Sequence, residues 1–165
     1  MNTASEQIPA YDSEPRLRAV ENQPLQYLRI GVPQSVLTPQ QLTELAGIVR
    51  RYSPRHMLRL RSATQLEVAI LPTQRPPEPL LSRSETYINT RRSAPEGTGV
   101  STLRVHVPGA QLRVRQLRVL AALMHLEDLR TIRIIDSETL IIENVWHSRA
   151  AVLQLGLREA GLITR

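Results

Sequence analysis

The sequence contains an internal duplication, and this restricts the possible folds more than any single residue does. Residues 28–71 return in altered form as residues 103–145, about 75 positions later. The identical residues are Leu28, Arg29, Val32, Pro33, Leu37, Gln41, Leu42, Leu45, Ala46, Arg59 and Leu66 in the first copy, matched by Leu103, Arg104, Val107, Pro108, Leu112, Gln116, Leu117, Leu120, Ala121, Arg133 and Leu140 in the second. The second copy has lost one residue between helix and strand, where a loop tolerates the loss. Because two copies are too few for a solenoid, we expect a single domain built from two related halves.

The length and composition fit one core shared by the two halves. The chain has 165 residues, 41% of them apolar, which is enough for one ordinary hydrophobic core. The sequence contains no cysteine. This excludes disulfides, thiolate metal ligands, cysteine-held iron–sulfur clusters and cysteine nucleophiles.

The charge of the chain favours anionic partners. All 21 basic residues are arginines, and the formal net charge is +6. Arginine keeps its charge when partly buried and grips carboxylates or phosphates in a fork. No apolar run approaches the roughly 20 residues that a membrane span needs, and the polar start has neither a basic leader nor an apolar segment. We expect a soluble cytoplasmic protein without membrane association.

Apolar spacing predicts the same order of elements in both copies. Alternating apolar residues indicate strands, and apolar residues three or four apart indicate helices. Half-domain 1, at residues 25–71, is predicted to contain a strand at 28–32, a helix at 39–52 and hairpin strands at 57–61 and 65–71. Half-domain 2, at residues 103–165, is predicted to contain a strand at 103–107, a helix at 114–126, strands at 131–135 and 139–145, and an added helix at 149–160.

Capping residues mark two of the predicted helices. Thr38, Pro39 and Gln41 supply an N-cap, a proline at the first helical position and a capping-box glutamine. Ser148 is predicted to cap the last helix and Gly161 to stop it.

Two segments lack apolar periodicity. Residues 1–24 are polar and predict a disordered N-terminal arm. Residues 72–102 are rich in proline and arginine and predict a long connector. Within this connector we expect Leu80 and Leu81 to dock as a short turn, where the second copy has its last helix.

The predicted order of elements resembles that of a known family. A strand, Val-Pro, a helix rich in Gln-Leu and Leu-Ala, and a Leu-Arg-Leu hairpin resemble the ferredoxin-like half-domain of siroheme-dependent sulfite and nitrite reductases, a family that includes precorrin-3B synthases. The matching segments are Leu28–Leu71 and Leu103–Leu162, well over half of the chain. The resemblance implies an α+β fold in which two ferredoxin-like half-domains, related by a pseudo-twofold axis, form one joint domain.

The sequence departs from this family at the cofactor-binding positions. In the family, a Thr-Thr-Arg-Gln-like turn after the Leu-Arg-Leu strand places a cation against the siroheme or its oxyanion ligand. The corresponding residues 61–64 and 135–138 lack the Arg-Gln pair, and the four cluster cysteines and the larger cofactor-holding domains have no counterpart. We therefore expect no catalytic residues, no cofactor held by this chain alone and no reductase activity of this chain by itself. Siroheme would be bound only if it were shared with a partner chain.

Five arginines form the candidate binding surface. Arg59 and Arg61 lie two residues apart on a predicted strand, so their side chains leave the same face. Arg133 repeats Arg59, and Arg104 repeats Arg29. If the halves pair as in the family, these arginines converge on one surface that can bind a tetrapyrrole polycarboxylate, another anion or an acidic partner. An ordinary solvated face, whose arginines discourage pairing of sheet edges, is the simpler interpretation and stays open.

The other polar residues give weaker signals. The four histidines have no metal-ligand spacing, so we expect no metal site. Asp136 and Glu138 lie in a predicted hairpin turn, where such residues form local hydrogen bonds. Arg50, Arg51 and Arg55 at the end of the first helix complement its dipole, and the chain has few aromatic residues on which nucleic-acid bases could stack.

These observations favour a nitrite/sulfite reductase-like protein without cofactor ligands. We expect a non-catalytic accessory or binding subunit that recognises a partner or an anionic ligand through its arginines. One alternative is a split oxidoreductase subunit that completes a siroheme site with a partner chain bearing siroheme and an iron–sulfur cluster. An arginine-driven nucleic-acid binder is a further, disfavoured alternative.

Overall fold

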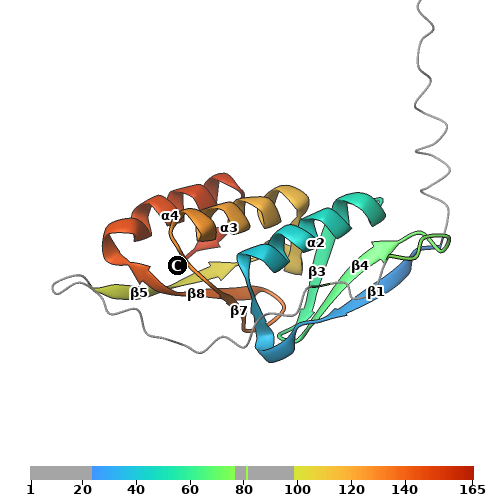
Figure 1. Ribbon diagram of the computed structural model, residues 1–165, viewed down its shortest axis with the longest axis horizontal. Helices are drawn as coiled ribbons and strands as arrows, with labels where there is room; N and C mark the ends of the chain where they lie inside the picture. Colours follow the sequence, from blue (N-terminus) through green and yellow to red (C-terminus); the bar gives the residue numbers. More distant parts are fainter. Residues whose placement is uncertain (1–23, 77–80, 82–98) are drawn as a thin grey trace, which may run out of the picture.

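The computed structural model describes residues 24–76, 81 and 99–165. These residues form three α-helices and two antiparallel sheets, which confirms the predicted α+β class. Figure 1 shows the three helices on one face of the sheets. The predicted arm at residues 1–24 lies outside the described residues except for Pro24, and the middle of the predicted connector at 72–102, residues 77–80 and 82–98, also lies outside them.

The two halves begin with the same six elements in the same order. The first half contains β1 (Gln26–Gly31), the 3-10 turn η1 (Pro33–Ser35), β2 (Val36–Leu37), α2 (Pro39–Tyr52), β3 (Met57–Ser62) and β4 (Gln65–Ile70). The second half contains β5 (Val100–His106), η2 (Pro108–Ala110), β6 (Gln111–Arg113), α3 (Val114–Leu126), β7 (Ile132–Ile134) and β8 (Thr139–Trp146), followed by α4 (His147–Glu159) and β9 (Ile163–Thr164).

The halves exchange short strands. One sheet has the order β1-β4-β3-β6 and the other β2-β7-β8-β5-β9. Strand β6 of the second half pairs with β3 of the first, at Leu58↔Leu112, and β2 of the first half pairs with β7 of the second, at Leu37↔Ile132. Neither sheet is therefore built from one half alone.

The two copies also agree in their turn geometry. Gln34 and Ser35 have left-handed backbone angles, with φ of 58° and 59°. Their counterparts Gly109 and Ala110 have φ of 64° and 57°. Such angles are uncommon for residues other than glycine, so their recurrence at matched positions reflects the duplication.

The core lies between the helices and the sheets. Leu58, Leu60 and Leu66 of the first sheet point toward the helices and are at most 1% exposed. Helices α2 and α3 pack against each other, and Leu45 and Leu120 in them are fully buried. Each such leucine contributes about 1.5–3 kcal/mol by leaving water. The apolar stripes read from the sequence thus hold the helices against one face of the sheets.

The helix ends follow the predicted capping in two cases of three. In α2, Gln41 donates its backbone N–H to the Thr38 hydroxyl (3.2 Å), and the Gln41 side chain accepts from the Thr38 N–H (3.0 Å), so the predicted capping box is confirmed. Gly161 follows the end of α4 with φ of 82°, as a helix stop should. Ser148 as an N-cap is wrong, because α4 begins at His147 and no side chain caps it.

Several strands differ from the prediction. Strand β5 begins at Val100, three residues earlier than predicted. Strands β2, β6 and β9 were not predicted, because two or three residues are too few to show alternation. Of the leucine pair expected to dock, Leu81 packs partly buried against the core, and Leu80 lies outside the described residues.

Candidate anion-binding face

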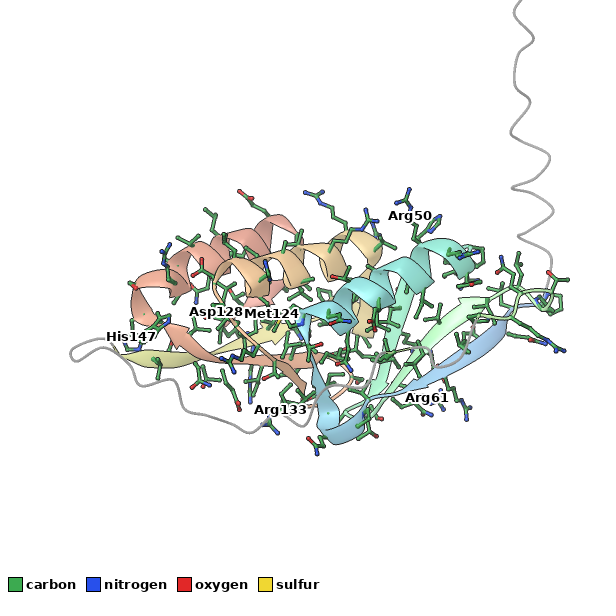
Figure 2. All side chains as sticks on the ribbon, viewed as in Figure 1. Arg50, Arg61, Met124, Asp128, Arg133 and His147 are labelled. Atoms are coloured by element: carbon green, nitrogen blue, oxygen red, sulfur yellow. The ribbon has the colours of Figure 1, made fainter. Side chains whose placement is uncertain are left out.

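The candidate site is the face of the two sheets that lies opposite the helices, which we call the open face. In Figure 2, Arg61 and Arg133 lie on this side of the molecule, whereas Arg50 lies on the helix side. Strand alternation places each arginine of the predicted surface here, since its strand neighbours point into the core. The predicted surface residues Arg29, Arg59, Arg61, Arg104 and Arg133 are all exposed.

Three of these arginines gather around one carboxylate. Glu67 of β4 stands directly opposite Arg29 of β1 and Arg59 of β3. The Glu67 Oε1 atom lies 3.1 Å from Arg61 Nη1 and 3.6 Å from Arg29 Nε. We call Arg29, Arg59, Arg61 and Glu67 the Glu67 cluster.

The Glu67 cluster is positively charged and holds a buried acid. Glu67 is only 4% exposed, although it lies on the face that the described helices leave uncovered. The arginine side chains beside it supply the opposite charge that a buried carboxylate needs. The cluster carries three positive charges against one negative charge, and half or more of the Arg61 and Arg29 side-chain surface is exposed. An additional anion can therefore reach guanidinium groups that are already held in place.

The remaining two arginines form a second group on the other sheet. Arg104 of β5 and Arg133 of β7 stand on either side of Ile141 in β8. Arg133 Nε lies 3.6 Å from Glu143 Oε1, and both side chains are nearly half exposed. Arg104 exchanges backbone hydrogen bonds with Arg165, which brings another arginine to this row. We call Arg104, Arg133, Ile141 and Arg165 the Ile141 row.

The duplication shows how the two groups differ. Glu67 and Arg61 of the first copy correspond to Ile141 and Ile135 of the second. Ile135 is 40% exposed and Ile141 is partly exposed, so the open face of the second sheet is more apolar. The open face thus joins a charged cluster on one sheet to a mixed arginine and isoleucine row on the other.

The predicted convergence of the five arginines is only partly seen. Arg29, Arg59 and Arg61 come together around Glu67, and Arg104 and Arg133 flank Ile141. Among the described residues, no hydrogen bond or ion pair joins the first group to the second. The five arginines therefore share a face but form two groups.

Sequence reasoning overlooked Glu67, which organises the first group. A signal for it was present, since Glu67 is the single charged residue of its strand and stands between the apolar residues Leu66 and Val68. Strand alternation directs such a residue to the face opposite the core, where the arginines were expected.

The hairpin turn beside the Ile141 row contains an acid with a perturbed pKa. The pKa of Asp136 is lowered, chiefly because its carboxylate accepts a hydrogen bond from the Glu138 backbone N–H (2.8 Å). The Thr139 side chain and the charge of Arg104 lower it further. Asp136 is thus ionised at neutral pH and acts as a turn former, as the sequence predicted.

The described residues contain neither a metal-binding cluster nor a membrane-spanning helix. Within residues 24–76, 81 and 99–165, no group of three or more histidine, aspartate and glutamate side chains is placed to hold a metal ion. No helix in the same ranges has both the length and the apolar character needed to cross a membrane.

Comparisons with protein-family models, curated proteins and solved structures gave no match to this chain.

Proposed function

We propose that this protein is a non-catalytic accessory or binding subunit related to the nitrite/sulfite reductases, and that it recognises an anionic partner or ligand through the open face. The observation that carries this proposal is the exposure of five arginines on the side of the sheets that the described helices leave uncovered. The excess positive charge of the Glu67 cluster adds to it. Catalysis and any siroheme would then belong to a partner chain.

The same proposal includes the relation between the halves. We take each half to be a ferredoxin-like half-domain and the two to be related by a pseudo-twofold axis. The common order of six elements, the reciprocal exchange of β2 and β6, and the recurring left-handed turns support this relation. Such an arrangement presents the first strands of both halves, with Arg29 and Arg104, on one side of the protein.

The open face is suited to binding carboxylates. Each arginine can donate two parallel hydrogen bonds to one carboxylate group. The arginines project from strands, so their backbone positions are fixed before binding and less entropy is lost. Attraction between exposed charges weakens beyond about 8 Å at physiological salt, so the contacts would have to be close. A flexible polycarboxylate or an acidic protein segment meets these requirements.

The proposal is tested by removing one arginine from each group. The Arg59→Ala, Arg133→Ala double variant should bind poly-L-glutamate about tenfold more weakly than the wild type, a loss of about 1.4 kcal/mol. The matched control replaces Arg50 and Arg118, two exposed arginines of α2 and α3, by alanine. This control has the same net charge and should bind within about twofold of the wild type. Titration calorimetry at fixed ionic strength measures both.

The outcome also separates the alternatives. Equal affinity in the double variant and the wild type would leave the open face as an ordinary solvated surface. Tighter binding to duplex DNA than to polyglutamate, with affinity falling steeply as salt rises, would favour a nucleic-acid binder. Native purification with an absorption spectrum tests the split oxidoreductase, because a visible band and a co-eluting cysteine-bearing chain would indicate a shared siroheme.

A further inference from the structure

Strand β1 forms an edge of its sheet. It is the first strand in the order β1-β4-β3-β6, and no described strand lies on its outer side. Just beyond the end of β1, the Val32 N–H donates to the Thr64 carbonyl (2.8 Å). In an antiparallel pair every second residue forms such hydrogen bonds to the partner strand, so this bond shows which residues of β1 face β4. The backbone groups of Tyr27, Arg29 and Gly31 therefore point away from β4. No described residue forms a backbone hydrogen bond with them from the outer side.

The second half shows how the equivalent edge is used. Strand β5 is the counterpart of β1, and β9 from the chain terminus lies along its outer edge. The Arg104 N–H donates to the Arg165 carbonyl (3.3 Å), and the Arg165 N–H donates to the Arg104 carbonyl (3.0 Å). In the sequence match, Arg104 corresponds to Arg29. The fold thus contains its own example of a short extended segment added at this position.

The added segment in the second half has alternating side chains. Leu162 and Thr164 are buried beneath the helices, whereas Ile163 and Arg165 are exposed. A segment on β1 would follow the same alternation, with every second side chain on the open face. One of these would stand next to Arg29, at the margin of the Glu67 cluster.

We infer that the outer edge of β1 accepts an extended acidic segment of a partner protein as an added antiparallel strand. This inference rests on the proposed function and names the form its partner takes. Main-chain hydrogen bonds give such strand addition its affinity, and alternate side chains give it specificity. The excess positive charge of the Glu67 cluster selects acidic side chains on the open face. A second copy of this chain fits less well, because its own β1 would bring another Arg29 to the same margin.

The experiment uses two synthetic peptides and the full-length protein. The first, acetyl-GLITEVE-amide, extends the Gly161–Arg165 sequence and places glutamate at the position of Arg165. The second, acetyl-GLITRVR-amide, has arginine at both glutamate positions and therefore carries the opposite charge. The acidic peptide should slow amide hydrogen exchange at Tyr27, Arg29 and Gly31 at least tenfold when saturating, and the basic peptide should not.

Two variants test the backbone and the charge separately. Tyr27→Pro removes one outward N–H, a change that an edge strand tolerates. It should lower the affinity for the acidic peptide at least tenfold. Arg29→Glu leaves the Glu67 cluster with two positive and two negative charges, so it should abolish the preference for the acidic peptide. Circular dichroism checks that both variants fold, and the charge reversal remains decisive if the proline variant does not.

The results distinguish this inference from the proposed function. Unchanged exchange at β1 in the presence of saturating acidic peptide would overturn strand addition. A second outcome is that the acidic peptide binds the wild type, binds Arg59→Ala more weakly and binds Tyr27→Pro as tightly as the wild type. The open face would then bind anions without using the edge of β1. If neither the acidic peptide nor polyglutamate bound, both proposals would fail.

Discussion

Glu67 determines what the arginines beside it contribute to stability. A buried carboxylate that loses its partner is left with an uncompensated desolvation cost, whereas an exposed pair contributes little. Glu67 is buried and Glu143 is not, so two superficially similar ion pairs should differ in energy.

Replacing Arg61 by alanine should therefore destabilise the protein more than replacing Arg133. The Arg61→Ala variant loses the closer of the two cations on Glu67, and we expect a cost of about 1–3 kcal/mol. The Arg133→Ala variant should cost less than about 1 kcal/mol, because its partner Glu143 is 42% exposed. Urea unfolding monitored by circular dichroism measures both. Equal costs would show that Glu67 does not depend on Arg61.

The lowered pKa of Asp136 predicts how the stability of the fold changes at acid pH. Because its pKa is lower in the folded state than in the unfolded chain, its ionised form stabilises the fold. This contribution is complete above the pKa of the unfolded chain and is lost as the pH falls through the lower folded value. Asp136→Ala should thus be less stable than the wild type at pH 6, and the difference should shrink below about pH 4. Thermal unfolding across this range checks it, and a difference independent of pH would count against the assignment.

The candidate site could be predicted only in part. Strand alternation was enough to place Arg59 and Arg61 on one face, since it depends on local geometry alone. The strands of Arg61 and Glu67 were predicted to pair as a hairpin, but their contact depends on the register, which shifts between Leu60 and Ser62 and which a single sequence does not fix. The alignment of the two copies shows that Ile141 occupies the position of Glu67. Only the sheet order shows that each of these residues stands between two arginines.

The two copies cap their central helices differently. The residue before α3, Arg113, has nearly the same backbone angles as Thr38 before α2. Both helices keep the glutamine that accepts from the N-cap N–H, with Gln116 at 2.8 Å from Arg113 N in the second copy. Arginine has no acceptor, so Arg113 cannot complete the box as Thr38 does.

Restoring the missing acceptor should stabilise the second half. Arg113→Thr places a hydroxyl where the backbone already has the N-cap conformation, and we expect a gain of about 0.5–1 kcal/mol. In the first half, Thr38→Ala removes the hydroxyl that caps α2 and should lower the free energy of unfolding by about 1 kcal/mol. Both are read from urea midpoints at unchanged slope. A loss of stability in Arg113→Thr would mean that the Arg113 side chain has another structural role.

The elements that the sequence predicted well are those with local signals. The helix at 39–52 was correct at both ends, because Thr38 and the Ser53-Pro54 break mark them. The helix at 114–126 was correct because the duplication aligns it with the helix at 39–52, whose ends are marked in the sequence. Strands β2 and β9 could not be found in this way, because their existence depends on a partner strand distant in sequence.

The exchange of β2 and β6 makes the halves interdependent. Each sheet contains a strand from the other half, and α2 packs on α3 across the same junction. The buried residues of both halves belong to one core cluster. Folding of either half should therefore require the other.

A chain cut between its halves should stay together. We expect a protein with a protease site inserted between residues 90 and 91 to keep its circular dichroism spectrum and to elute as one species after cleavage. The fragments should separate only in denaturant and should refold only when mixed. Two folded fragments that separate in native buffer would show that strand exchange does not couple the halves.

The most direct examination of the open face is a map of where an acidic polymer binds the intact protein. Amide chemical shifts recorded during titration with poly-L-glutamate should change along β1, β3, β5 and β7, around Arg29, Arg59 and Arg104, and should stay constant on the exposed sides of α2 and α3. Shift changes confined to the end of α2, around Arg50 and Arg51, would show that the helix side is the anionic site and that the open face is not.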